Sequence, residues 1–222
     1  NAGVGQGKTT AIIEIVKEYY ENTDYIIFIA SPFVSLVEQY YKDVIKKDIP
    51  EKDIFRYELL GNDELTDFWH RRIHIVTANC ILGNPGEDAF INSKVKRYYL
   101  NRLSKYCEKY NKKVIFIYDE IHDAIHNFKE EYIFNLWKWR NVILKNYIIS
   151  ATYNEASKVV IEYLAELTND NIQIIESERK RFPSKQSELF LHYNNEQFYS
   201  YDDKTITNLV KELIFLGKEI DI

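Results

Sequence analysis

Apolar residues follow two alternating patterns along the chain. Short, mostly apolar runs occupy residues 25–30, 73–76, 114–118 and 147–149, and longer segments with apolar residues every three or four positions occupy 9–20, 37–47, 91–110 and 154–167. A continuous apolar run is typical of a parallel strand buried on both faces, whereas the wider spacing is typical of an amphipathic helix. The alternation predicts an α/β domain with a mainly parallel central sheet flanked by helices.

The predicted helix at 91–110 is basic, with tyrosines interleaved. Its cations, opposed by the single acid Glu108, are Lys94, Lys96, Arg97, Arg102, Lys105 and Lys109. Such a helix can face a polyanion, or it can be an ordinary solvated helix whose tyrosines pack inward. Because a run of charge most often marks a solvated face, we favour the second interpretation.

The composition limits the kind of protein. The 222 residues are enough for one large domain, or for one domain and the beginning of another. No apolar run approaches the roughly 18 residues of a membrane helix, so we expect a soluble protein without a membrane partner. The isolated Cys80 and Cys107 fit a cytoplasmic location, or a nuclear or viral replication compartment. The net charge of −5 argues against bulk attraction to nucleic acid, so such binding requires a local groove.

A glycine-rich segment, Ala2-Gly3-Val4-Gly5-Gln6-Gly7-Lys8-Thr9, runs directly into the first predicted helix. Glycines let backbone N–H groups surround phosphates, the lysine reaches the β- and γ-phosphates, and the following hydroxyl ligates Mg²⁺. The positive end of the helix dipole also favours bound phosphate. The pattern usually begins with glycine, where this chain has Ala2. The predicted nucleotide-binding residues are Gly3, Gly5, Gln6, Gly7, Lys8, Thr9 and Thr10.

Two adjacent acids follow the most strand-like run of the chain. Residues 114–118 lead straight into Asp119 and Glu120. Ligands of open α/β sheets bind outside the carboxyl ends of the strands, so this position suits a Mg²⁺-nucleotide site. Asp119 is expected to hold Mg²⁺, usually through water, and Glu120 to orient and deprotonate the attacking water.

Four blocks in this order resemble motifs of superfamily 2 helicases and translocases, the group that contains the DEAD-box and DExH proteins. Residues 2–9 resemble motif I, residues 31–39 motif Ia, Asp119-Glu120-Ile121-His122 motif II of the DExH type, and Ser150-Ala151-Thr152 motif III. ABC transporter subunits and AAA-type machines share the phosphate loop but do not explain the last block. The resemblance implies a first RecA-like domain of the P-loop NTPase fold that uses ATP and Mg²⁺.

The resemblance also implies a role for each matched residue. Lys8 and Glu120 would be catalytic, and Thr9 and Asp119 would hold the metal ion. Backbone contacts to DNA or RNA, without sequence preference, would come from Ser31, Pro32, Phe33 and Thr77.

Coupling between hydrolysis and movement would involve His122, Ser150 and Thr152. A core histidine is the competing interpretation of His122, and a plain turn at a strand end is that of Ser150 and Thr152.

The resemblance covers nearly the whole chain and implies its domain organisation. We expect residues 1–187 to form the first RecA-like domain, with its leading strand missing, and 188–222 to be a linker and the start of an incomplete second RecA-like domain. An arginine finger from a second domain contributes on the order of 10³ to 10⁵ in rate. We therefore predict an ATP hydrolase of the helicase or translocase type, weak or inactive as this chain alone.

The alternative hypothesis is a helicase-like nucleotide switch or scaffold without unwinding activity. The presence of Lys8, Thr9, Asp119 and Glu120 together favours the enzyme, since a scaffold does not need all four. Strand separation and translocation along duplex use the same first domain, so both stay open.

Overall fold

The computed structural model describes residues 7–57, 68–82, 94–120, 135–150, 155–168 and 173. The chain divides into two compact units, Asn1–Arg179 and Lys180–Ile222, and every described residue belongs to the first. The predicted boundary after residue 187 lies outside the described residues and stays a prediction.

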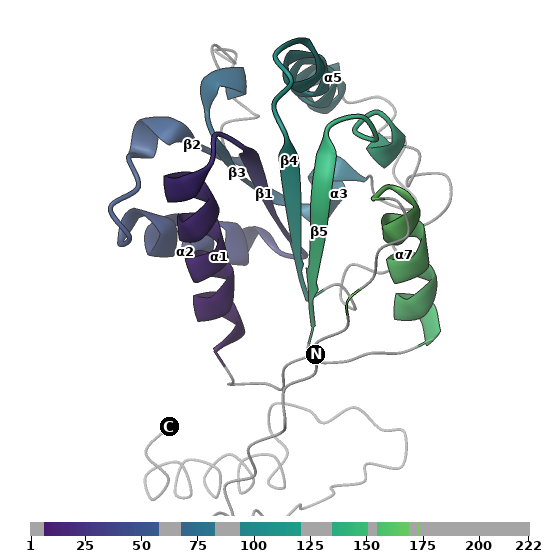
Figure 1. Cartoon of the computed structure of the whole chain (residues 1–222). Coiled ribbons are helices and arrows are strands. Elements are labelled where there is room, and N and C mark those ends of the chain that lie inside the picture. The colour runs from purple at the N-terminus through teal and green to yellow at the C-terminus, as the bar shows by residue number, and fades with distance from the viewer. Residues whose placement is uncertain are drawn as a thin grey trace, which may run out of the picture. The chain divides into compact units, whose positions relative to one another are not determined.

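Five parallel strands form the central sheet of the described part of the chain (Figure 1). Their order across the sheet is β2-β3-β1-β4-β5. Their bounds are Ile26–Ser31 for β1, Ile54–Arg56 for β2, Ile73–Thr77 for β3, Val114–Asp119 for β4 and Ile143–Ile149 for β5. All four pairings between neighbouring strands are parallel. The sheet confirms the predicted α/β class and its RecA-like parallel arrangement.

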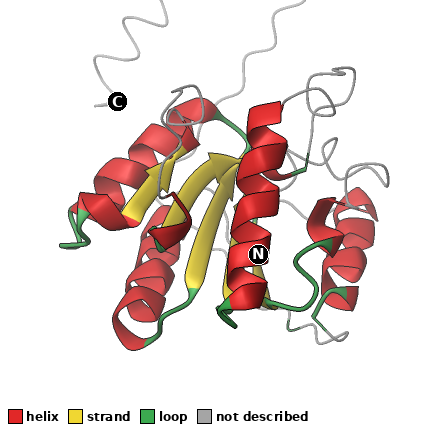
Figure 2. Ribbon diagram, turned by 90° about the horizontal axis from the view of Figure 1, so that it is seen from above, coloured by secondary structure: helices red, strands yellow, loops and turns green. Residues whose placement is uncertain are grey.

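Helices cover both faces of the sheet (Figures 1 and 2). α1 (Lys8–Asn22) and α2 (Val34–Ile45) pack on one face. α3 (Ala78–Ile81), α5 (Lys94–Lys109) and α7 (Glu155–Glu166) pack on the other. Parallel neighbours require crossover connections, so the helices that return the chain also bury the two faces of the sheet.

The two faces of the sheet carry different side chains. Beneath α1 and α2 the strands present isoleucines, namely Ile27, Ile29, Ile73, Ile75, Ile115 and Ile117. The opposite face is aromatic, because Phe28 stacks on Phe116 and on His74, with ring centroids 4.6 and 5.0 Å apart. Successive side chains of a strand point to opposite faces, so each central strand serves both cores and must be apolar on both sides.

Short 3₁₀ turns lead into two of the strands. η1 (Glu51–Asp53) precedes β2, and η3 (Phe68–His70) precedes β3. Phe68 of η3 is buried against the aromatic face, where its ring meets those of Phe55 and Tyr99 at 6.0 and 5.1 Å. The η3 turn is thereby fixed beside α5.

One strand is longer than its sequence pattern indicated. The strand predicted at 147–149 begins at Ile143, and most of its residues are partly exposed. β5 is the last strand of the described sheet, so Lys145 and Asn146 are tolerated within it and interrupt the apolar run that marks a buried strand.

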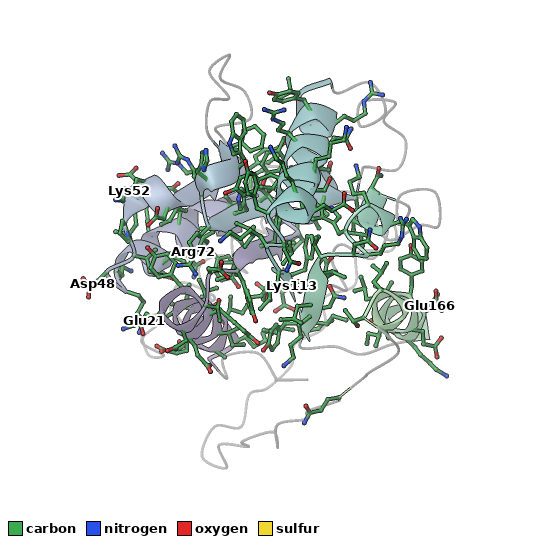
Figure 3. The ribbon with its side chains drawn as sticks, turned by 45° about the horizontal axis from the view of Figure 1, so that its top comes forward. Glu21, Asp48, Lys52, Arg72, Lys113 and Glu166 are labelled. Carbon is green, nitrogen blue, oxygen red and sulfur yellow. The ribbon has the colours of Figure 1, made fainter. Side chains whose placement is uncertain are left out.

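Charged side chains lie on the outside of the layers. Glu21, Asp48 and Glu166 are exposed and point away from the sheet (Figure 3). Among the described helices, none is long and apolar enough to cross a membrane.

Candidate active site

The end of the phosphate-loop segment forms the N-terminus of α1. Gly7 is the N-cap and has φ 77° and ψ 25°, a left-handed conformation that favours glycine. Its carbonyl accepts the first helical hydrogen bond from Ala11 at 2.9 Å. Lys8, Thr9 and Thr10 therefore occupy the first turn, where free N–H groups and the helix dipole favour an anion. The predicted residues Gly3, Gly5 and Gln6 lie outside the described residues.

Asp119 and Glu120 stand at the carboxyl end of β4, as predicted. Asp119 is buried, and burial raises the pKa of its carboxyl while the hydrogen bond from Tyr40 opposes that rise. Glu120 has a φ of 46°, an uncommon left-handed conformation for a residue with a side chain. Its N–H donates to the Ile149 carbonyl of β5 at 2.8 Å. The left-handed residue ends the strand and turns its carboxylate toward α1.

Lys8 and Glu120 are in direct contact. The Lys8 ammonium donates a hydrogen bond to Glu120 Oε1 and forms an ion pair with it, although 112 residues separate the two. The Lys8 and Glu120 side chains are only 11% and 22% exposed. The fold therefore brings the predicted phosphate-binding lysine and the predicted water-activating acid to one point at the carboxyl edge of the sheet.

Tyr40 of α2 joins the two predicted metal ligands. Its hydroxyl donates a 2.6 Å hydrogen bond to Asp119 Oδ2 inside the protein. Burial raises the pKa of Tyr40 well above its usual range, the bond to Asp119 raises it further, and a hydrogen bond with the Thr9 side chain opposes the shift. The Thr9 side chain therefore acts on the same phenol that donates to Asp119. The sequence pattern assigned Tyr40 only to the apolar stripe of a helix, since a tyrosine there is indistinguishable from a core residue.

The donor set fits a magnesium ion. Mg²⁺ prefers oxygen ligands and is commonly held by one or two carboxylates, with substrate phosphates and water completing its coordination. The Thr9 hydroxyl and the Asp119 carboxylate supply such oxygens beside the helix N-terminus. Within the described ranges, no group of three or more His, Cys, Asp or Glu could hold a metal ion.

The predicted nucleic-acid contacts lie at the neighbouring strand ends. Ser31 of β1 and Thr77 of β3 are register partners, and both are buried. The Ser31 hydroxyl donates to the Phe33 carbonyl at 3.1 Å and accepts the Phe33 N–H at 3.3 Å, while Thr77 Oγ1 accepts the Cys80 N–H at 3.2 Å. Pro32 is half-buried and Phe33 is 53% exposed. The two hydroxyls shape the turns, and contact of these four residues with nucleic acid stays a prediction.

The predicted coupling residues are only partly described. Ser150 directly follows β5 and is buried, next to the Ile149 carbonyl that accepts the Glu120 N–H. Ser150 is therefore the residue next to Ile149, whose backbone is hydrogen-bonded to Glu120. His122 and Thr152 lie outside the described residues.

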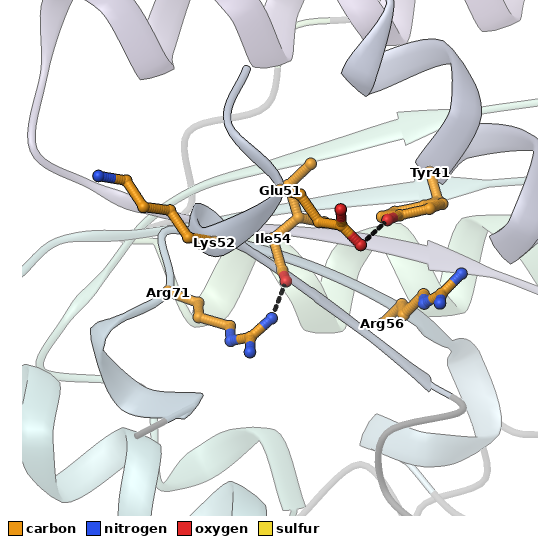
Figure 4. Close-up of a pocket in the computed structure, with 6 residues that line it drawn as sticks. All are labelled: Tyr41, Glu51, Lys52, Ile54, Arg56 and Arg71. Atoms are coloured by element: carbon orange, nitrogen blue, oxygen red, sulfur yellow. Dashed lines mark hydrogen bonds between the residues drawn. The ribbon is translucent and has the colours of Figure 1, made fainter. Parts of the chain in front are cut away.

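A separate pocket of about 380 Å³ lies beside β2 (Figure 4). It is lined by Tyr41, Glu51, Lys52, Ile54, Arg56 and Arg71. Much of its polar lining is bonded within the protein, since Glu51 accepts the Tyr41 hydroxyl, Arg71 donates to the Ile54 carbonyl and Arg56 pairs with Glu38. None of the predicted site residues lines this pocket, so we assign it no part in the nucleotide site.

The arrangement agrees with what is found among known protein families. The family model of the DEAD/DEAH box helicases matches residues 1–159. The chain belongs to this family. Membership in the DEAD/DEAH box helicases confirms the resemblance to superfamily 2 and identifies the described sheet as part of a helicase-type RecA-like domain. Membership in this family implies the use of a nucleotide. No curated protein matches the chain.

Two solved structures resemble this DEAD/DEAH box domain. The UvsW helicase from bacteriophage T4 is 14% identical with a TM-score of 0.47, and the match covers 72% of this chain and 50% of that one. Cas3 of T. fusca, with ADP, is 13% identical with a TM-score of 0.44, and the match covers 75% of this chain and 20% of that one. The chain thus spans half the length of the first protein and a fifth of the second.

Proposed function

We propose that this chain binds Mg²⁺-ATP at the carboxyl edge of its sheet and forms the first motor domain of an ATP-dependent nucleic-acid helicase or translocase. The observation that carries the proposal is the contact of Lys8 with Glu120, beside Asp119 and the first turn of α1. A lysine, two acids and a threonine hydroxyl converge on a helix N-terminus, which is the set of groups that phosphoryl transfer from ATP to water requires.

Each group has a distinct task in hydrolysis. Lys8 binds the β- and γ-phosphates, and the N-terminus of α1 adds backbone donors. Thr9 and Asp119 would hold Mg²⁺, which when bound neutralises charge on the phosphates. Glu120 orients the attacking water and accepts its proton.

Nucleotide binding must separate Lys8 from Glu120. While the two are paired, the ammonium is not available to a phosphate and the carboxylate is not available to water. The γ-phosphate is a stronger hydrogen-bond acceptor for Lys8 than Glu120 is. Once Lys8 binds the phosphate, the Glu120 carboxylate is free to bind the water that attacks the γ-phosphate. The ion pair with Lys8 therefore keeps Glu120 from acting as a base until ATP binds.

Nucleic acid is proposed to cross the neighbouring strand ends. Ser31, Pro32, Phe33 and Thr77 would meet the DNA or RNA backbone there, with slight sequence preference because phosphate and sugar contacts do not read bases. His122, Ser150 and Thr152 would couple the nucleotide to a second RecA-like domain.

The test is ATP turnover with single-stranded DNA, single-stranded RNA and duplex, for the chain alone and joined to a second RecA-like domain in one polypeptide. We expect slow turnover from the chain alone. The joined protein should be stimulated by one of the polymers, and Glu120→Gln should abolish the stimulated rate. ATP binding without stimulated turnover would instead favour the nucleotide switch or scaffold, and fast turnover by the chain alone would contradict the need for a second domain.

A further inference from the structure

One surface of α5 combines exposed tyrosine rings with cations that form no ion pair among the described residues. Arg97, Arg102, Lys105 and Lys109 are exposed, and no ion pair involves any of them within the described part of the chain. The one acid of the helix, Glu108, accepts a hydrogen bond from Asn141 at 3.1 Å. A strongly positive face therefore stands on a chain whose net charge is −5.

Aromatic rings continue along the same face. Tyr98 and Tyr110 are 50% and 54% exposed. Tyr110 packs on Tyr106, with ring centroids 4.8 Å apart, and Tyr106 meets the ring of His70 at 5.6 Å. Trp69 directly precedes His70 in η3, and the centroids of the two rings lie 5.8 Å apart. The sequence pattern assigned the tyrosines of this helix to the core. This holds for Tyr99, which is buried, but not for Tyr98, which faces solvent.

Two cations of α5 form cation–π contacts with neighbouring aromatic rings. The Arg102 guanidinium lies 4.9 Å above the Trp69 ring, and the Lys109 ammonium lies 5.1 Å from the centre of the Tyr110 ring. We call the set of Trp69, Tyr98, Arg102, Lys105, Lys109 and Tyr110 the α5 surface. Its groups can meet phosphates and flat apolar rings at the same time.

The α5 surface is separate from the nucleotide site. α5 packs on the aromatic face of the sheet, whereas the nucleotide site is built from α1, α2 and the carboxyl end of β4. Trp69 precedes β3 and Tyr110 precedes β4, so this end of the surface lies near the amino ends of the strands (Figure 1). The predicted contacts Ser31 and Thr77 lie at the opposite, carboxyl ends.

We propose that the α5 surface is a second binding surface for single-stranded nucleic acid. Its cations contact phosphates, and Tyr98 and Tyr110 stack on bases. Alternation of positive charge with exposed rings is how proteins bind single strands without reading sequence, whereas duplex keeps its bases stacked on one another. The proposal rests on the proposed function for the identity of the polymer, but uses none of the residues of the nucleotide site.

The experiment measures binding of a fluorescent oligothymidine of about 20 nucleotides, long enough to follow such a surface, to the 222-residue chain over a range of salt concentrations. Arg102→Glu with Lys105→Glu removes the charge, and Tyr98→Ala with Tyr110→Ala removes the rings. The matched control is Lys17→Glu with Lys158→Glu, which changes the net charge equally on α1 and α7. All substituted side chains are at least partly exposed, and thermal unfolding checks that each variant folds.

The two kinds of variant should fail differently. Each phosphate contact adds about 0.7 to the salt slope for single strands, so the charge variant should weaken binding about tenfold and lower the slope by about one or more. The ring variant should weaken binding by about tenfold with an unchanged slope, since stacking releases no counterions. The control should stay within about twofold of the unchanged chain, because long-range charge is screened by salt.

Three results would overturn the proposal: no binding of the oligonucleotide by the unchanged chain, equal loss in the control, or a charge-dependent loss without any effect of the rings. The last would indicate a surface for acidic proteins or polyanions in general. Mg²⁺-ATP binding is measured on the same samples. It should persist in the α5-surface variants, so failure of this surface and failure of the proposed nucleotide site are separately visible.

Discussion

The Tyr40 hydroxyl donates a 2.6 Å hydrogen bond to Asp119 Oδ2, linking α2 to the end of β4. α2 begins three residues after Ser31, and Asp119 is the proposed metal ligand. A single buried phenol therefore connects the segment that resembles motif Ia with the segment that resembles motif II. A shift of α2 would move the hydrogen-bond partner of Asp119, and Thr9, whose side chain lowers the pKa of Tyr40, is near the same phenol.

We predict that Tyr40→Phe lowers the free energy of unfolding by about 1–3 kcal/mol, since it leaves a buried carboxylate without its donor. Urea unfolding measures the loss. Tyr41→Phe is the matched control on the same helix, because the Tyr41 hydroxyl donates to the exposed Glu51, and its loss should stay below about 1 kcal/mol. Equal losses in the two variants would show that the bond to Asp119 stabilises the fold no more than the bond from Tyr41 to Glu51 does.

The left-handed backbone of Glu120 predicts an unusual order of stability among its variants. Glu120→Ala and Glu120→Gly both remove the partner of Lys8, but only alanine keeps the Cβ that disfavours a φ of 46°. The glycine variant should therefore be the more stable of the two by about 1 kcal/mol, the opposite of the usual ranking. Thermal unfolding of the two variants measures this difference. A more stable alanine variant would contradict a left-handed, strained backbone at residue 120.

The buried His74 predicts a loss of stability in acid. Burial lowers the pKa of His74 to about 3, and the neutral ring fits between the Tyr99 hydroxyl and the Arg71 carbonyl. Below the unfolded pKa of about 6.5 the unfolded chain binds a proton that the folded chain excludes, so stability falls as the pH falls. Between pH 7 and pH 5 this group should remove about 2 kcal/mol.

The matched comparison for that pH effect is His74→Gln. Glutamine can bond to the same two partners but does not titrate, so the stability advantage of histidine should shrink by about 2 kcal/mol on going from pH 7 to pH 5. Urea unfolding at both values gives the difference. Parallel pH dependence of the two proteins would mean that His74 does not control this acid response.

Local patterns predicted the strand and helix alternation, because each central strand is apolar on both faces and each long helix has an apolar stripe. Motif spacing also placed Lys8 and Thr9 at the start of a helix and Asp119 and Glu120 at the end of a strand, where the structure has them. The contact between Lys8 and Glu120 follows from sheet order, which no local pattern encodes. Likewise, Tyr40 and Tyr98 carry no sign of their surroundings, since the rotation of each helix decides which tyrosine meets Asp119 and which meets solvent.

The most direct test of the nucleotide site is calorimetric binding of ATP to the chain, with Mg²⁺ and with the metal chelated. The unchanged chain should bind Mg²⁺-ATP, and Lys8→Ala should weaken binding about 10- to 100-fold, as expected for a lost charge-assisted hydrogen bond. Glu120→Gln should bind Mg²⁺-ATP at least as tightly as the unchanged chain, because no ion pair with Lys8 has to be broken before the phosphates bind. Equal affinity of the unchanged chain and Lys8→Ala, or no binding by either the unchanged chain or Glu120→Gln, would contradict an ATP site at this edge of the sheet.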